Sequence, residues 1–357
     1  MKYKITLILL LSALGIQAQT TTKYSNEFLN IGVGADAFGQ ANAVVASSSD
    51  VNSGYWNPAG LLNIEDYQIS VMHAAYFANI ANYDYLGGAM PLDDGKSAVG
   101  FSMIRFGVDD IMNTTKLIDD QGIINYDRIS LFSAADYAFT FSYARELPVE
   151  GLSFGANAKV IRRIIGKFAD AWGFGFDLGV QYQTESNWKF GLMARDITTT
   201  YNTWNINKEK YQDIQDAVPG QNQELPETTE ITLPKLQIGA AKTFELHPDW
   251  HLKGEIDLIT RFTQTHDIIS SSSISITPAG GFELDYLNMV FVRGGVGNFQ
   301  NEEQFDGSNS LSFMPSLGVG FHYKGIHVDY AFTDIGDQSV ALYSNVFSLT
   351  LDWSIFR

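Results

Sequence analysis

The sequence contains no cysteine, and only 9 of its 357 residues are proline. Without cysteine the chain has no disulfide, no thiolate metal site and no thiol nucleophile. Basic residues are also scarce, with 23 Lys and Arg against 40 Asp and Glu, so the formal net charge is −17. This composition argues against a nucleic-acid binder, which needs clustered basic residues to displace counterions. Aromatic residues (13%) and 32 glycines are abundant instead. They argue against disorder and favour many strands over helices.

Long hydrophobic runs are missing as well. The apolar run at residues 5–14 is about ten residues long, too short to span a bilayer as a helix. Lys2 and Lys4 precede it, and small and polar residues follow it up to Ala18. We therefore expect residues 1–18 to be a secretory signal peptide, the alternative being a buried N-terminal strand. Beyond Ala18 no stretch is long and apolar enough for a transmembrane helix. The mature protein is then either exported and soluble, or it crosses a membrane as strands.

The C-terminal end alternates strictly between apolar and polar residues. Its apolar positions are Phe347, Leu349, Leu351, Trp353 and Ile355. A period of two residues is the signature of a strand with two unlike faces. The same alternation recurs at residues 137–143, 172–182, 250–258, 313–323 and 326–332.

The two faces of these segments differ in a way that favours a membrane barrel over a soluble sandwich. The apolar face is large and aromatic over about ten residues, the length that a tilted strand needs to cross a bilayer. The other face carries small residues and the charges Lys159, Arg163, Lys189, Arg195, Lys253, Glu255, Asp257, Glu283 and Arg293. Such charges suit a water-filled lumen and would be costly in a dry core. Because backbone groups in lipid must pair with each other, the strands have to close into a barrel.

Counting such segments gives about fourteen strands, an even number that suits an outer-membrane barrel. They are expected to begin near Tyr67, Asn82, Ser97, Asp136, Leu152, Ala171, Trp188, Lys235, Trp250, Ile274, Met289, Leu311, Ile326 and Asn345. Short connections alternate with mostly longer ones, near residues 108–135, 199–234, 260–273, 298–310 and 335–344. Short periplasmic turns and long outer loops are typical of outer-membrane barrels. We expect an all-β fold, a transmembrane antiparallel β-barrel over residues 66–357 in the cell outer membrane, in contact with its lipid.

The segment before the first expected strand is rich in Gly, Ala and Ser. It ends in the string Trp56, Asn57, Pro58, Ala59 and Gly60. Small residues let the backbone pack closely against a barrel wall, and Asn-Pro favours a turn. We expect residues 19–65 to form an N-terminal plug inside the lumen, the alternative being a loose periplasmic tail.

These residues carry a resemblance. Asp36, Ala37 and Gly39, followed by the string at residues 55–61, resemble the PorV/PorQ family of Bacteroidota outer-membrane proteins, which are similar to the FadL fatty-acid channels. The resemblance covers the mature chain in layout and is specific in sequence around residues 36–62. It implies a fourteen-stranded barrel with an N-terminal hatch that works in the type IX secretion system. PorV-like members there bind the translocon or the C-terminal signal domain of cargo, and PorQ-like members hold a surface partner. The Tyr55-Trp56 lead-in looks more PorV-like, whereas the terminal Arg357 departs from the usual aromatic end.

Motifs for catalysis are absent from the sequence. It has no G-x-S-x-G elbow, no H-E-x-x-H and no phosphate loop. Glu255, Asp257 and Glu283 could supply a carboxylate pair for acid–base work, but ion pairing with Lys253, Arg293 and Lys159 inside the lumen is the expected role. His322 and His327 are expected to be lumen neighbours that are solvated or hydrogen-bonded, with a metal pair as the alternative. We therefore expect no enzyme, no cofactor and no metal.

Two of the expected long loops combine acidic and aromatic residues. The aromatic residues are Tyr201, Trp204, Tyr211, Phe299 and Phe305. Aromatic anchors dominate the energetics of protein interfaces, so these five are candidate docking residues for a protein partner. The alternative is an ordinary solvated loop whose charge discourages aggregation.

Three functional hypotheses follow. The first is a docking or shuttle component of the type IX secretion system, with the translocon or cargo C-terminal signal domains as partners and no nucleic acid. The second is a FadL-like channel for small hydrophobic molecules, which needs an apolar pocket between hatch and loops. The third, an outer-membrane hydrolase, is disfavoured because no Ser/His or metal constellation was found.

Overall fold

The computed structural model describes residues 25–76, 80–119, 121–217, 228–303, 307–333 and 344–356. The expected signal peptide, the first residues of the expected plug, Phe305 and Arg357 lie outside these ranges. Within them, no helix combines the length and apolar character needed to cross a bilayer.

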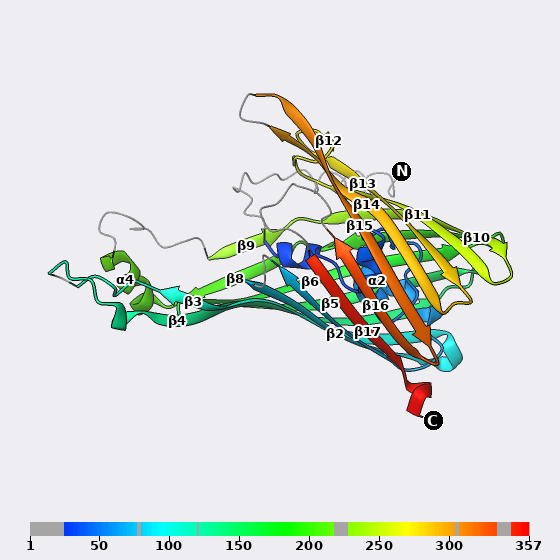
Figure 1. The fold of residues 1–357 in the computed structure, drawn as a ribbon, viewed down its shortest axis with the longest axis horizontal. Coiled ribbons are helices and arrows are strands. Elements are labelled where there is room, and N and C mark those ends of the chain that lie inside the picture. The colour runs from blue at the N-terminus through cyan, green and yellow to red at the C-terminus, as the bar shows by residue number, and fades with distance from the viewer. Residues whose placement is uncertain are drawn as a thin grey trace, which may run out of the picture.

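Across the described residues, 14 strands form one closed antiparallel barrel (Figure 1). They are β1 (Gln68–Tyr76), β2 (Ala81–Leu92), β3 (Ser97–Asn113), β4 (Ser130–Glu146), β5 (Leu152–Ile165), β6 (Ala169–Gln183), β7 (Trp188–Arg195), β10 (Lys235–His247), β11 (Trp250–Arg261), β13 (Ser275–Tyr286), β14 (Val290–Glu303), β15 (Asn309–Tyr323), β16 (Ile326–Thr333) and β17 (Ser344–Asp352). Each strand pairs with the next, and β1 closes the barrel by pairing with both β2 and β17. The predicted fold class and strand number are confirmed.

Alternation along the strands sorts their side chains to the two sides of the wall. On β6, Phe174 and Phe176 point outward and are 59% and 50% exposed, whereas Ala171 and Asp177 between the outward positions are buried. Outward apolar residues on neighbouring strands pack together, as do the rings of Phe101 and Phe141, whose centroids are 5.1 Å apart. The apolar face therefore meets lipid and the polar face meets the lumen.

Tight turns close the strands at one end of the barrel. Lys324 and Gly325 link β15 to β16 with φ angles of 49° and 80°. Two consecutive positive φ angles are the mark of a type I′ hairpin turn, whose twist matches that of the strands. Trp188 and Trp250 begin strands at the same end and are partly exposed, where an interfacial aromatic belt belongs.

The opposite end differs from expectation, because two of the predicted loops contain strands. β3 and β4 are 17 residues long each, although about 9–11 residues suffice to cross a bilayer. β8 (Thr200–Ile206) and β9 (Thr229–Thr232) continue the sheet beside β6, α4 (Lys208–Ala217) follows β8, and β12 (Ile269–Ser270) pairs with β13. We name the outer part formed by residues 108–119, 121–135, 199–217 and 228–232 the outer extension; it projects from the barrel at the left of Figure 1. Outside lipid both faces of a strand can be polar, so the alternation that reveals a strand disappears.

The residues before β1 fold into short helices inside the barrel, and we name the described residues 25–67 the hatch (Figure 1). Its elements are η2 (Glu27–Asn30), α2 (Ala35–Gly39), α3 (Ser53–Trp56) and η3 (Pro58–Asn63). Hatch residues such as Val33 and Trp56 share one buried cluster with Tyr83 and Ile104 of the wall. The remaining short helices are η4 (Asp93–Gly95), η5 (Tyr126–Arg128) and η6 (Trp353–Phe356).

Candidate functional site

The Trp-Asn-Pro-Ala-Gly string lies where the hatch meets the wall. Trp56 Nε1 donates to the Val33 carbonyl at 2.9 Å, which ties two hatch segments together. Asn57 Nδ2 donates to the carbonyl oxygens of Val45 in the hatch and Val180 on β6, both at 3.0 Å. Pro58 begins η3, and Asn57 caps this helix by accepting a bond from Ala59 N. Proline suits a first helical position because its missing N–H would have no partner there.

Glycines allow the hatch to approach the wall closely at this contact, which we name the seam. A Cβ at Gly155 of β5 would overlap the backbone of Pro58 and Ala59, and one at Gly179 of β6 would overlap the Asn57 side chain. Gly60 is constrained from the hatch side, since a Cβ there would overlap the Ser48 carbonyl. The string and the glycines of the wall thus form complementary surfaces.

Arg195 at the end of β7 contacts Tyr55 and Trp56, the two residues before Asn57. Its Nη2 donates to the Tyr55 carbonyl at 2.8 Å, and its Nε donates to Gln237 Oε1 at 2.7 Å. The guanidinium also lies 4.3 Å from the centroid of the Tyr55 ring and 5.8 Å from that of Trp56. The sequence indicated a lumen charge here, but not its hatch partner.

Two lumen carboxylates bind hatch backbone rather than the expected cations. Glu255 Oε1 accepts from Ala46 N at 2.6 Å, and Asp257 Oδ2 accepts from Val45 N at 3.1 Å. Their predicted pairing with lumen cations is therefore wrong, because both side chains are directed at the backbone of Val45 and Ala46 in the hatch. Lys159 instead pairs with Asp177 and Asp196.

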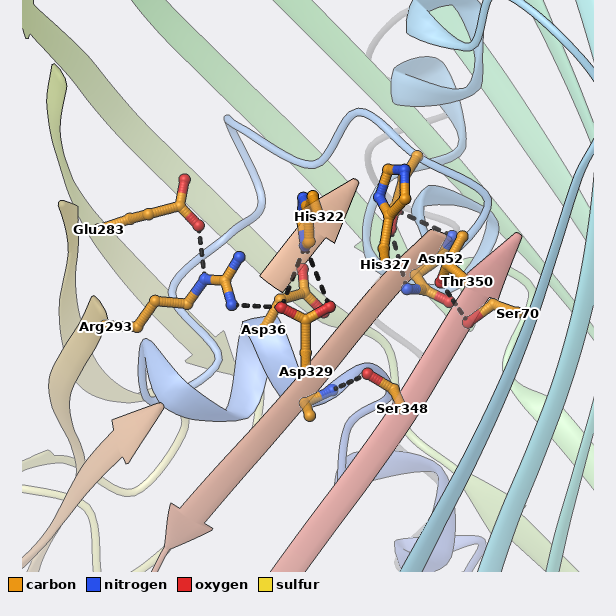
Figure 2. A network of polar contacts seen from close by, with 12 residues as sticks. Asp36, Asn52, Ser70, Glu283, Arg293, His322, His327, Asp329, Ser348 and Thr350 are labelled. Atoms are coloured by element: carbon orange, nitrogen blue, oxygen red, sulfur yellow. Dashed lines mark hydrogen bonds and ion pairs between the residues drawn. The ribbon is translucent and has the colours of Figure 1, made fainter. Parts of the chain in front are cut away.

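Glu283 is ion-paired as expected and is the first member of the polar network shown in Figure 2. Its carboxylate lies 3.1 Å from Lys253 Nζ and 2.5 Å from Arg293 Nε. Arg293 Nη1 lies 2.6 Å from Asp329 Oδ1, which also contacts His322. Five strands, β11 and β13 to β16, are thereby joined next to α2.

The two histidines are neighbours, as predicted. The rings of His322 and His327 stack with centroids 4.3 Å apart, and they contact Asp329 and Asp352 at 3.2 Å each. Among the described residues, no group of three or more His, Cys, Asp and Glu is placed to hold a metal ion.

Two hatch carboxyl groups lie close to this network. Asp36 of α2 points toward Arg293 and Asp329 in Figure 2; burial raises its pKa, and Asp329 and Glu283 add to the rise against the opposing effect of Arg293. Burial, with a contribution from Asp36, raises the pKa of the Asp50 carboxyl to about 7. Asp50 accepts bonds from the backbone N and the Nδ2 of Asn52, both at 2.9 Å. The hatch therefore brings two carboxyl groups with raised pKa into the barrel, and only for Asp50 is the value about 7.

The four predicted docking residues that the structure describes lie on three different elements. Tyr201 and Trp204 lie on β8 with opposite orientation, Tyr211 lies on α4, and Phe299 lies on β14, where its ring is 6.0 Å from that of Phe313. These four are therefore not loop residues, because the strands and α4 extend through the segments expected to be loops. Tyr201 is paired with the lipid-facing Phe174, a position that suits an interfacial aromatic.

Trp204 faces inward, and Arg163 lies against it with the guanidinium 5.1 Å from the ring centroid. Arg163 also pairs with Asp136 at 2.9 Å and Glu230 at 3.0 Å. The same Glu230 accepts a bond from Ser25 Oγ at 3.1 Å. The start of the hatch is thus tied to the outer extension, a link that the sequence pattern did not reveal.

Solved structures of similar fold include toluene transporters and a monoaromatic hydrocarbon channel. The Pseudomonas putida toluene transporter TodX is 14% identical, with a TM-score of 0.54 over 90% of this chain and 99% of that chain. The monoaromatic hydrocarbon channel CymD is 13% identical, with a TM-score of 0.56 over 93% of this chain and 99% of that chain. The Ralstonia pickettii toluene transporter TbuX is 11% identical, with a TM-score of 0.51 over 90% of this chain and 98% of that chain. At such low identity the likeness establishes the fold alone. No curated protein is detectably similar to the chain.

The sequence itself matches a family more specifically. The family described as "Type IX secretion system protein PorV" matches residues 15–257, which include the whole hatch and the wall strands that contact Asn57. The match covers more than half of the chain. The protein is an outer-membrane β-barrel that belongs to the PorV family of type IX secretion system proteins.

Proposed function

We propose that this barrel is a docking or shuttle component of type IX secretion, which presents its outer extension to the translocon or to cargo C-terminal signal domains. The observation that carries the proposal is the apolar tip between β3 and β4. Its exposed side chains are Met112, Ile118, Ile123, Ile124, Tyr126 and Leu131. Exposed apolar clusters of this kind mark sites of interaction with other proteins or membranes.

The position of the tip relative to lipid supports a protein partner. Arg105 points outward on β3 and pairs with Asp109 at 3.1 Å. Ion pairs on the outer wall are costly in hydrocarbon, so this pair marks the level at which the lipid ends. Residues 112–119 and 121–131 lie further along the hairpin, where lipid no longer covers their apolar side chains.

The tip is an ordered structure rather than a loose loop. Ile118 and Ile124 form a β-bridge, and Asp119 Oδ1 accepts from the backbone N of Gln121 and Ile123 at 3.0 and 2.9 Å. A surface that is already ordered loses less conformational entropy on binding. This favours rigid presentation of the docking surface.

Affinity purification from mild detergent tests the proposal. We expect the protein to retain translocon subunits or cargo C-terminal signal domains, and a Tyr126→Ser variant to retain much less of them. Tyr182→Ser is the matched control, because Tyr182 is also exposed but lies near the short turns. An isolated monomer with bound lipid, or equal losses in both variants, would contradict the proposal.

The alternative, a channel for small hydrophobic molecules, is favoured by the fold shared with hydrocarbon transporters. Such a channel needs an exit through the wall. The wall strand is interrupted between β7, which ends at Arg195, and β8, which begins at Thr200. Ile197 N donates to the Phe176 carbonyl at 3.0 Å and Asp196 N donates to Asp177 Oδ1 at 2.9 Å there. These bonds to β6 hold the wall together at the interruption.

Deleting residues 30–62 separates the two functions. A channel becomes leaky or loses uptake of hydrophobic substrate while protein secretion stays normal. A secretion component instead leaves cargo trapped in the periplasm.

A further inference from the structure

A cavity of about 550 Å³ lies between the hatch and the outer ends of the wall strands. Phe38, Tyr55 and Trp56 of the hatch line it together with wall residues that include Lys235 and Thr333. Lys235 is the first residue of β10 and Thr333 is the last of β16, so the cavity is on the side of the long connections. A segment that approaches from the cell surface would meet it first. Its size is within the range of ligand pockets.

The cavity is basic, although the protein carries a net charge of −17. Of its three basic side chains, Arg261 pairs with Asp267 at 2.7 Å. The other two bind neutral oxygens: Lys235 Nζ is 2.5 Å from Asn30 Oδ1, and Arg195 donates to the oxygens of Tyr55 and Gln237.

Nearby carboxylates do not neutralise these two cations. Asp196, the neighbour of Arg195, binds Lys159 at 2.7 Å. Glu27 lines the cavity, but it is exposed and accepts a bond from Asn30 Nδ2. Across the described parts of the chain, neither Arg195 nor Lys235 has a carboxylate partner within ion-pair distance. Uncompensated charge in a partly buried site is costly, so the site favours an anion.

The other residues that line the cavity favour an anion that also carries apolar groups. Ile31, Phe38, Ile259 and Met314 contribute apolar surface. Polar side chains that can bond to peptide groups, Thr277 and Gln300 among them, lie between these apolar residues. Thr277 Oγ1 and Gln300 Nε2 already donate to Phe299 O and Asn298 Oδ1. Asn42 Oδ1, which also lines the cavity, is buried and has no hydrogen-bond partner among the described residues. An alkyl chain would leave this oxygen without a partner, which is unfavourable.

We propose that this cavity binds the free C-terminal carboxylate of a partner polypeptide, together with apolar side chains next to that end. Arg195 and Lys235 receive the carboxylate through charge-assisted hydrogen bonds. The inference rests on the proposed docking function and adds to it a second, recessed contact.

The test uses the full-length protein immobilised from maltoside. Two libraries of N-acetylated decapeptides, randomised at the last four positions, are offered: one ends in a carboxylate and the other in an amide. Decanoate is offered separately, because it supplies the same carboxylate on an alkyl chain. We expect the acid library to be retained at least about tenfold over the amide library, as loss of a charge-assisted hydrogen bond implies.

Variants connect the retention to the cavity. Lys235→Gln should reduce retention of the acid library to the level of the amide library, and Lys235→Arg should keep it. Lys242→Gln is the matched control, since Lys242 is on the same strand but lies over the outward Trp188 ring at 4.9 Å. Folding of each variant is checked by heat-modifiable migration on gels.

Several results would overturn the inference: equal retention of the two libraries, retention of neither, the same loss in Lys242→Gln, or binding of decanoate alone. Failure of the docking function looks different. In that case the wild-type protein retains no translocon or cargo at all. If the cavity assignment alone is wrong, wild type and Lys235→Gln co-purify with the same partners.

Discussion

Asn57 Nδ2 of the hatch lies 3.0 Å from the carbonyl oxygen of Val180 on β6. The side chain is fully buried, and the same nitrogen reaches the Val45 carbonyl. One amide group therefore joins the hatch turn, the helix η3 and the wall.

Asn57→Asp replaces this donor by a carboxylate that faces carbonyl oxygens. We expect the free energy of unfolding to fall by about 1–3 kcal/mol or more, because buried groups lose their partners. Thermal unfolding in detergent measures the loss. Asn63→Asp is the control, since Asn63 makes a single bond to the Gly60 carbonyl in a less buried position. Equal effects of the two substitutions would mean that Asn57 does not hold the seam.

Adding one methyl group at Gly179 should displace the hatch. A Cβ there overlaps the Asn57 side chain, whereas a Cβ at Gly254 of β11 meets no atom within 4 Å. Overpacking typically costs about 1–3 kcal/mol. Gly179→Ala should therefore expose the hatch to limited proteolysis, and Gly254→Ala should not. Identical digestion of the two variants would contradict the close packing described here.

The stability of the hatch inside the barrel should fall as pH rises. Burial raises the pKa of Asp36 and Asp50, the latter to about 7. A carboxyl group whose pKa is raised in the folded state stabilises that state below its unfolded pKa of about 3.9, and this stabilisation is lost as pH rises through the folded value. The loss should therefore extend from about pH 4 to slightly above pH 7.

Because the chain has no cysteine, Asn63→Cys gives a single site for a spin label in the hatch. Label mobility should rise between pH 5 and pH 8, and the added variant Asp50→Asn should flatten that rise. Mobility that is independent of pH, or unchanged pH dependence with Asp50→Asn, would show that Asp50 is not the titrating group.

Removing Arg163 should loosen the outer extension without opening the barrel. Arg163→Gln loses contacts with Asp136, Glu230 and the Trp204 ring. We expect hydrogen exchange in β8 and β9 to speed up about tenfold, the effect of losing one hydrogen bond to a charged group. Arg128→Gln, in the exposed η5, is the control. Unchanged exchange in β9 would mean that other contacts hold this extension.

Much of the barrel could be predicted from the sequence because lipid imposes a simple rule on each strand. Where lipid and lumen lie on opposite sides, alternation shows the strand, and β5, β7, β10, β11 and β16 begin at the residues expected. β8 shows no such contrast in its sequence, because polar residues lie on both of its faces: Asn202 is buried and Thr203 is exposed. β9 has only four residues. β8 is recognised only from its pairing with β6, in which Tyr201 lies opposite Phe174. The sequence alone does not reveal this register.

The hatch string could be found because its residue types are unusual together. Its partners could not, since they lie far away in sequence: Arg195 is 140 residues from Tyr55, and Glu230 is 205 residues from Ser25. The sequence predicts ion pairs for Glu255 and Asp257 for the same reason. Only the folded hatch brings the N–H groups of Val45 and Ala46 to them.

The most direct test of the docking account is photo-crosslinking in living cells. A photoreactive phenylalanine analogue at Tyr126, in the apolar tip, should crosslink to a translocon subunit or a cargo C-terminal signal domain, while the same group at Tyr182 should not. If position 126 yields only lipid adducts or no product, with secretion intact, the tip does not contact the secretion machinery and the account is wrong.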